Sequence, residues 1–192
     1  MTRKKRMIVA VSVAVLTVTV VAALLLLRKK PAAFEPERVT KAVATEQGMA
    51  EFIKVKLFFL SETSAYMRPV QREVEVPEIR EELYRKFVSL LLAGDSEHIT
   101  PAPGGTQLRS LFYLDSKKML VLDFNERLNR DFPSGSTAEL QFIYFLVDNL
   151  CYNFREIEKV QFLVDGNESK TLSGHIDLEN PFYPDFSWLK DE

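Results

Sequence analysis

Residue types that support hydrolytic chemistry gather near the end of the chain. Ser173, His175 and Asp177 alternate along the sequence, so an extended strand would place all three side chains on one side. A serine, a histidine and an acid are the members of a hydrolase relay, but such a relay draws its members from separate elements of the fold. The solvated polar face of a strand, with the intervening residues pointing inward, therefore explains the pattern better.

A pair of carboxylates is the second candidate for chemistry. Asp123 and Glu126 come together at the end of a predicted strand. Glycosidase-type hydrolysis needs two carboxyl groups a fixed distance apart across a cleft. Asp is also a common turn residue, which favours capping of a helix or a loop by Asp123. A membrane-anchored hydrolase that uses Asp123, Glu126 or His175 stays open as the alternative function.

The other reactive residues lack the neighbours that their chemistry requires. His98 and His175 have no cysteine or histidine at metal-ligand spacing. Cys151 falls on the apolar face of a predicted helix, where a free cysteine behaves as a small buried hydrophobe. Gly104 and Gly105 are not followed by the Lys-Ser/Thr of a phosphate-binding loop, and they precede a strand. We therefore expect no catalytic residue, metal or cofactor.

Charge is distributed unevenly along the chain. The net charge is −2, but the first fifty residues hold nine basic and three acidic residues, so the rest of the chain is acidic. Phosphate backbones are bound by clustered lysine and arginine. An acidic globular part therefore excludes nucleic acid as its partner.

The N-terminus has the pattern of a membrane anchor. An uncharged run at residues 7–27 lies between basic residues 3–6 and 28–30. As a helix it would be about 31 Å long, enough to cross a hydrocarbon core of about 30 Å. It is too long for a typical secretory signal and lacks a well-placed cleavage site, so we expect an uncleaved anchor. The slight excess of basic charge before the run predicts that residues 1–6 form a cytoplasmic stub, with the globular part outside the cell membrane.

Hydrophobic periodicity predicts a linker at residues 28–50 and one globular domain at residues 51–192. Gly94 is placed to end the first helix. The order is β-β-α-β-β-α-β-β, which predicts an α+β fold with two helices packed on one face of a mostly antiparallel, mixed sheet. The predicted strands are residues 51–60, 70–76, 108–114, 119–124, 160–164 and 171–176, and the predicted helices are residues 79–93 and 137–153.

Short motifs occur in a set order along this domain. Pro103-Gly104-Gly105-Thr106 precedes a strand, and Asp123 lies between apolar residues at the end of the next strand. A serine-led helix begins at Ser136, and a later strand closes on Asp165-Gly166. Over residues 52–177 this ordered set resembles the GerMN domain of spore-germination and sporulation envelope proteins. The chain departs from the family pattern by the extra glycine of its PGGT segment and by Gly94-Asp95, where the family often has Gly-Pro.

The resemblance implies a non-catalytic, extracytoplasmic envelope domain that works by protein contact, with a fold similar to the ring-building modules of secretion systems. Its partner would be an envelope protein or a second copy of the chain. The family also occurs behind membrane anchors outside spore formers, so a role in sporulation or germination is possible but is not implied. The motif positions to which the resemblance gives a structural role are Pro103, Gly105, Thr106, Asp123, Asp165 and Gly166.

Apolar residues also occur on the backs of both predicted helices. Phe142 and Phe145 lie about 150–200° from the core face of the second helix, and Val88 and Leu92 have the same placement on the first. Either the aromatic C-terminal tail covers them, or they form an exposed surface for a partner or a second copy. Both interpretations stay open at this point.

Overall fold

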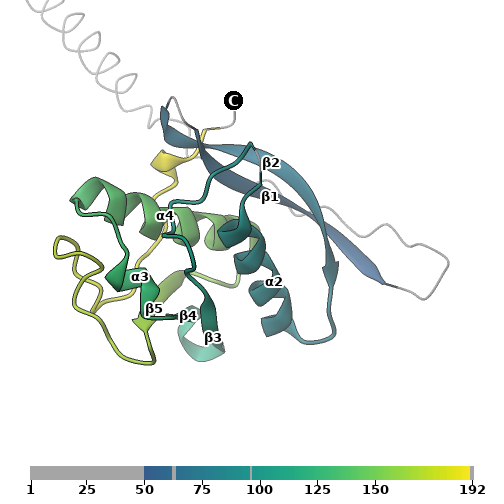
Figure 1. Cartoon of the computed structure of the whole chain (residues 1–192). Coiled ribbons are helices and arrows are strands. Elements are labelled where there is room, and N and C mark those ends of the chain that lie inside the picture. Colours follow the sequence, from purple (N-terminus) through teal and green to yellow (C-terminus); the bar gives the residue numbers. More distant parts are fainter. Residues whose placement is uncertain (1–49, 62–63, 96, 191–192) are drawn as a thin grey trace, which may run out of the picture. The chain divides into compact units, whose positions relative to one another are not determined.

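The computed structural model describes residues 50–61, 64–95 and 97–190 of the chain (Figure 1). The predicted basic stub, the predicted membrane helix at residues 7–27 and nearly all of the predicted linker lie outside the described residues. None of the helices within these ranges combines the length and the apolar character that crossing a membrane requires.

The fold is α+β, as predicted. Seven of the eight predicted elements form, most of them within one or two residues of the expected bounds. The strands are β1 (Glu51–Ser61), β2 (Ser64–Val76), β3 (Leu108–Leu114), β4 (Met119–Phe124) and β5 (Lys159–Val164). The helices are α2 (Arg80–Ala93), α3 (Arg127–Arg130) and α4 (Ser136–Asn153), with the 3₁₀ turns η1 (Asp115–Lys117) and η2 (Phe186–Trp188).

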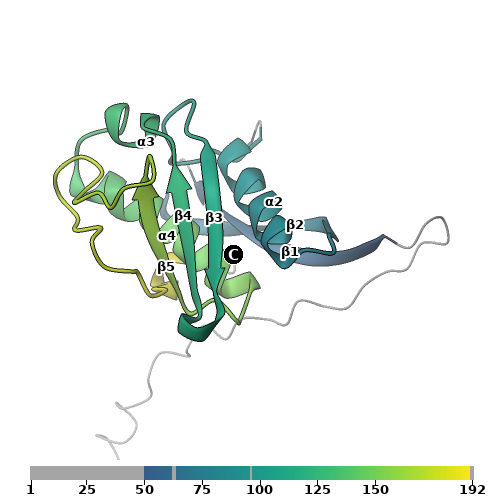
Figure 2. The ribbon, with the colours of Figure 1, turned by 90° about the horizontal axis from the view of Figure 1, so that it is seen from below.

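The prediction of one mixed sheet was wrong, because the described strands form two sheets. β1 and β2 make a long antiparallel hairpin that pairs Lys54 with Glu73. The second sheet has the order β3-β4-β5, in which β3 pairs antiparallel and β5 pairs parallel to β4. Figure 2 shows this three-stranded sheet face-on, with α4 behind it.

The last predicted strand does not form. Residues 171–176 make a series of bends, and β5 is followed by a tight turn in which Asp165 and Gly166 both have positive φ. The backbone of this segment does not pair with a described strand. Its N–H groups donate hydrogen bonds to the side chain of Glu139 in α4. A period of two is typical of a strand, but here it does not reflect strand pairing.

α2 ends where the sequence indicated. Gly94 has φ +56° and its N–H donates to the Leu90 carbonyl. A Cβ at this position would lie 2.4 Å from the carbonyl oxygen of His98. Only glycine avoids that contact in this conformation. Gly94 therefore ends the helix and leaves room for the backbone of the following loop at His98.

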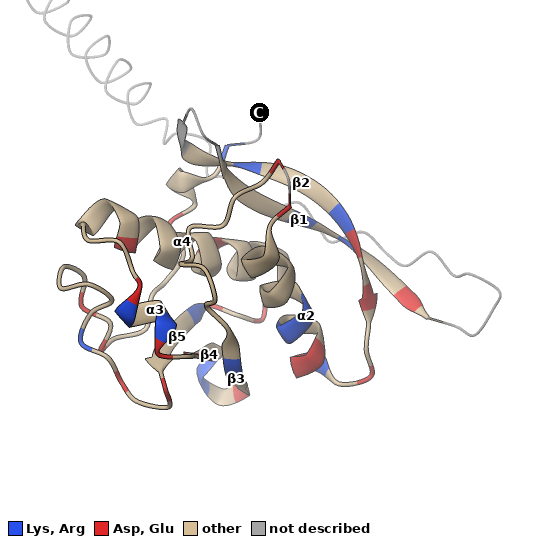
Figure 3. Cartoon of the chain, in the orientation of Figure 1, with Lys and Arg blue, Asp and Glu red and all other residues tan. Residues whose placement is uncertain are grey.

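α4 is the centre of the core, because it lies between the two sheets (Figure 1). The Phe142 ring contacts Phe124 of β4 and Phe162 of β5, whereas the Phe145 ring contacts Phe59 of β1. Figure 3 shows α4 almost without charge; its two acids are Glu139 and Asp148. A helix that is apolar all round is a buried helix.

The interpretation of Phe142, Phe145 and Val88 as an exposed interaction surface was therefore wrong. All three side chains are fully buried, and Leu92 is partly exposed. The strands cover Phe142 and Phe145, and the C-terminal tail contacts other residues of α4. The prediction failed because one core face was assumed for a helix that has sheets on both sides.

Candidate functional site

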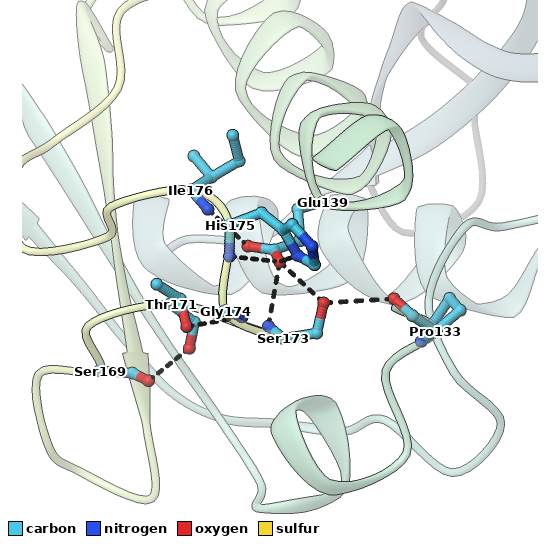
Figure 4. Close-up of polar contacts among 8 residues, drawn as sticks. All are labelled: Pro133, Glu139, Ser169, Thr171, Ser173, Gly174, His175 and Ile176. Atoms are coloured by element: carbon cyan, nitrogen blue, oxygen red, sulfur yellow. Dashed lines mark hydrogen bonds and ion pairs between the residues drawn. The ribbon is translucent and has the colours of Figure 1, made fainter. Parts of the chain in front are cut away.

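The most concentrated polar cluster of the described residues is built on Glu139, in the first turns of α4 (Figure 4). Its carboxylate is fully buried and accepts five hydrogen bonds from residues 173–176. Oε1 accepts from the Ser173 hydroxyl at 2.7 Å and from the His175 Nδ1 at 2.9 Å. Oε2 accepts from the Ile176 N–H at 3.0 Å.

The loop reaches this geometry through Gly174. Its φ of +105° turns the chain so that the N–H groups of Ser173, His175 and Ile176 converge on one carboxylate. Burial acts to raise the pKa of Glu139, but the hydrogen bonds from Ser173, Ile176 and His175 outweigh it and lower the pKa to about 2. Glu139 is therefore ionised at neutral pH and ties the loop to α4.

This arrangement differs from a hydrolase relay. In a relay the serine lies at the histidine nitrogen that is not bonded to the acid. Here the Ser173 hydroxyl and the His175 Nδ1 both bond the same oxygen of Glu139. Asp177 is not part of the cluster, because its carboxylate accepts from the Glu179 N–H. The structure brings together two of the three predicted residues, and it does so around an acid that sequence reasoning had not considered.

One sequence signal could have drawn attention to Glu139. Ser136 and Glu139 have the spacing of a capping box, which predicts that the glutamate bonds the helix's own first N–H groups. In the structure the cap residue is Gly135, without a side-chain hydrogen bond, and Glu139 bonds residues 34 to 37 positions later in the chain. The signal identified a bonded glutamate but not its partners.

The two carboxylates of the predicted pair, Asp123 and Glu126, have different contacts in the structure. Asp123 is buried and its Oδ1 accepts from the Gly166 N–H at 2.7 Å, which confirms the prediction of loop capping. Arg109 extends from a bulge in β3 and bonds Asp165 at 2.6 Å, with Asp123 3.6 Å away. Glu126 is exposed and pairs with Arg130.

The family-motif positions gather at one end of the three-stranded sheet, where Leu108, Phe124 and Val164 are in register. Gly105 has φ +83° and its carbonyl accepts from the Asn125 amide, which also accepts from the Gln107 N–H. Thr106 donates its N–H to the Pro103 carbonyl. These contacts close the loop that enters β3, so they hold the sheet end together.

The remaining candidates have structural surroundings. The His98 Nδ1 lies 2.7 Å from Asp95, and its ring contacts Phe59. Cys151 is buried, and burial raises the pKa of its thiol to about 12, so it is not a thiolate at neutral pH. No group of three or more potential metal-ligating side chains occurs within the described part of the chain.

The outer face of the three-stranded sheet carries exposed apolar side chains. Phe112 of β3 is 55% exposed and Leu114 is 37% exposed. Phe112 is paired with Val121 of β4, and Leu114 with Met119, so the four side chains form one apolar strip. Within this strip Val121 is buried and Met119 is partly exposed. In Figure 2 this face of the sheet is turned to the viewer and no helix crosses it.

One of the comparisons with known proteins, a scan against family models, identifies the kind of domain. A family model described as Germane, sporulation and spore germination, matches residues 56–170, more than half of the chain. The search of curated proteins found no match.

Three solved structures are similar to the chain. A protein described as a lipoprotein from Clostridium perfringens has 20% identity and a TM-score of 0.49, over 69% of this chain and 87% of that one. The first GerMN domain of the sporulation protein GerM from Bacillus subtilis has 13% identity and a TM-score of 0.47, over 65% and 94%. The tandem GerMN domains of the same protein have 12% identity and a TM-score of 0.47, over 66% and 44%.

Proposed function

Because the chain belongs to the Germane family of sporulation and spore germination domains, we propose that it is a membrane-anchored, extracytoplasmic module that works by protein contact and not by catalysis. The anchor in this proposal is the apolar run at residues 7–27. The partner is a protein of the cell envelope, which the apolar strip of the three-stranded sheet contacts.

The observation that carries the contact function is the exposure of Phe112. The Phe112 side chain contributes little hydrophobic stabilisation to the fold of its own chain, because more than half of its surface is exposed to water. Leu114, Val121 and Met119 extend the apolar strip on the same face. Aromatic side chains supply large contact areas at protein interfaces and are enriched there.

The polar cluster at Glu139 supports a non-catalytic module. Its donors converge on one buried carboxylate, and the Ser173 hydroxyl bonds that carboxylate and the Pro133 carbonyl instead of the imidazole. The contact of Glu139 with His175 is the one observation that favours the alternative, a membrane-anchored hydrolase. Substrate turnover by the full chain that is lost in His175→Asn or Asp123→Asn would establish that alternative.

Site-specific photocrosslinking in the native membrane tests the contact surface. A photoreactive residue at position 112 should give a discrete adduct, and Leu114→Asp in the same chain should weaken it. The matched control is position 85 on α2, where Arg85 is also exposed to solvent. The same adduct from both positions, or none from position 112, would contradict the proposed surface. An adduct of twice the chain mass would mean that the partner is a second copy.

Cysteine labelling tests the location. Glu179→Cys places a thiol on an exposed loop, whereas the native Cys151 is buried and serves as an internal control. A membrane-impermeant maleimide should label the variant in intact cells and leave the unmodified chain unlabelled. Labelling of the variant only after lysis would place the domain in the cytoplasm.

A further inference from the structure

The C-terminal strap, residues 181–190, crosses α4 and connects the two sheets (Figure 1, yellow). Phe182 exchanges backbone hydrogen bonds with Val160 of β5, at 2.8 and 2.9 Å. At the other end the Lys190 N–H donates to the Met67 carbonyl of β2 at 3.0 Å. Between these ends Trp188 stacks on Tyr144 of α4, with ring centroids 5.8 Å apart. The strap thus covers part of α4 and one backbone acceptor of β2.

Beneath the strap lies a carboxyl group with incomplete hydrogen bonding. Asp148 of α4 is fully buried, and its Oδ1 accepts from the Asp185 N–H of the strap at 2.9 Å. Its Oδ2 has no hydrogen-bond partner within the described residues. The titratable groups near it are Tyr144 and Cys151 on α4 and Asp185 on the strap.

These surroundings disfavour a charge on Asp148. Burial raises its pKa to about 8, and the negative charge of Asp185 adds to this effect, while the hydrogen bond from the Asp185 N–H opposes it. Burial also raises the pKa of Cys151, to about 12, and that of Tyr144. Asp148 is therefore the group of this cluster that changes its charge between pH 5 and pH 9.

We propose that Asp148 controls the closure of the C-terminal strap, which stays on α4 while the carboxyl is neutral and dissociates from it when the carboxyl ionises. A neutral carboxyl accepts a hydrogen bond from the Asp185 N–H, and its burial does not carry the desolvation penalty of a charged group. An ionised carboxyl under the closed strap has one hydrogen-bond donor and a neighbouring negative charge. Opening of the strap gives that charge access to water.

The direction of the pH dependence follows from proton binding. When the strap opens, the pKa of Asp148 moves back toward its ordinary value of 3.8. At pH values between this value and about 8 the open form binds fewer protons than the closed form, so a rise in pH favours opening. The ratio of open to closed strap can rise by up to about tenfold per pH unit, and it levels off above the pKa of the closed form.

Opening would change the surface that the domain presents. It removes Trp188 from Tyr144, and it frees the Met67 carbonyl on the outer edge of β2. An uncovered strand edge with adjacent aromatic side chains can pair with an extended segment of another protein. Release of the strap does not depend on the proposed contact function, so the two can fail separately.

Trp188 is the only tryptophan of the chain and reports on the strap directly. Its emission is followed from pH 5 to pH 9 in the full chain, kept in a nonionic detergent. We expect a shift to longer wavelength as the pH rises in the unmodified chain, and a flat profile in Asp148→Asn. Asp148→Ser, which keeps a hydrogen-bond acceptor but cannot ionise, is a second variant should the asparagine disturb folding. Asp185→Asn removes a negative charge that raises the pKa of Asp148, so in this variant the shift should be smaller and should level off at a lower pH.

Amide hydrogen exchange provides an independent readout. The Asp185 and Lys190 N–H groups bond Asp148 and Met67, outside the strap. Their protection factors should fall at least tenfold between pH 6 and pH 9 in the unmodified chain, and should stay constant in Asp148→Asn. An unmodified chain with no change in emission or protection over this range would overturn the proposal. So would an identical pH dependence in the unmodified chain and in both variants at position 148.

Discussion

The side-chain amide of Asn149 pairs with the backbone of Phe58 as a neighbouring strand would. Its Nδ2 donates to the Phe58 carbonyl at 2.8 Å, and its Oδ1 accepts from the Phe58 N–H at 2.7 Å. One helical turn later, Asn153 forms the same two hydrogen bonds with Lys56. The two amides therefore occupy the edge of β1 that faces away from β2, and they join α4 to the hairpin.

Replacement of Asn149 by leucine should destabilise the domain strongly. Asn149→Leu is similar in size, but it leaves the buried N–H and carbonyl of Phe58 without partners. Each unsatisfied buried group costs about 1–3 kcal/mol, so we expect a loss of about 2–4 kcal/mol in the free energy of unfolding. Urea unfolding of the full chain measures this loss in the free energy of unfolding. Asn180→Leu, at an exposed position, is the control and should change stability by less than about 0.5 kcal/mol. A similar small change in Asn149→Leu would contradict the pairing.

Glu139 should make the stability depend on pH in the acid range. Its folded-state pKa of about 2 lies below its ordinary value of 4.5, so the stabilisation is complete above pH 4.5 and is lost as the pH falls toward 2. The contribution is at most about 3 kcal/mol. Glu139→Gln should be less stable than the unmodified chain at pH 7, and the gap should narrow below pH 4. Glu168→Gln, an exposed position, should leave the acid profile unchanged. Parallel profiles for Glu139→Gln and the unmodified chain would refute this role.

Phe142 and Phe145 should behave as core residues when they are substituted. Both side chains are completely buried between the sheets, so Phe142→Ser or Phe145→Ser removes buried rings and leaves a cavity. Loss of a buried phenylalanine costs about 3–5 kcal/mol, and a serine adds a polar group to the core. Thermal unfolding should show a large fall in Tm or no folded protein. The matched control is Phe112→Ser, which should leave Tm nearly unchanged because the ring is exposed. A well-folded Phe142→Ser domain would overturn the assignment of that ring to the core.

The two adjacent glycines at the entry to β3 should respond differently to alanine. Gly105 has φ +83°, where a Cβ costs about 1–2 kcal/mol, and its Cβ would lie 2.9 Å from the Cδ atom of Arg127. Gly104 has no positive φ, and a Cβ there meets no atom within 4 Å. We expect Gly105→Ala to destabilise by at least about 1 kcal/mol, and Gly104→Ala to be neutral or slightly stabilising. Equal effects in urea unfolding would show that the loop does not need the left-handed conformation.

Most local elements could be predicted because their signals are local. The alternation in residues 51–60 and 70–76 predicted two strands of the hairpin, and Gly94 marked the end of α2 at the residue where it occurs. The capping role of Asp123 followed from the turn chemistry of its residue type and is confirmed by its bond to the Gly166 N–H. The inferences on the strands and on the end of α2 need only neighbours within a few positions of the chain, whereas the partner of Asp123 lies 43 positions away.

The two wrong predictions have the same cause. Hydrophobic periodicity along the sequence does not show which elements pack against each other. α4 was given one core face, but the sheets lie on both sides of it, so Phe142 and Phe145 are internal. Residues 171–176 were assigned to a strand, but their N–H groups bond Glu139, more than thirty positions earlier. Both outcomes depend on which elements meet in space.

The sequence by itself determined the α+β class, the presence of the hairpin, the bounds of the main helices, and the family, because these depend on short-range patterns of apolar residues, glycines and turn residues. It did not predict that β2 begins at Ser64 and not at Val70. Only the tertiary structure decided that Glu139 gathers Ser173 and His175, that the sheets divide into two, and that the strap lies over Asp148. These features come from contacts between residues far apart in the chain. The free energy of each contact depends on how deeply its residues are buried, which a local sequence pattern does not show.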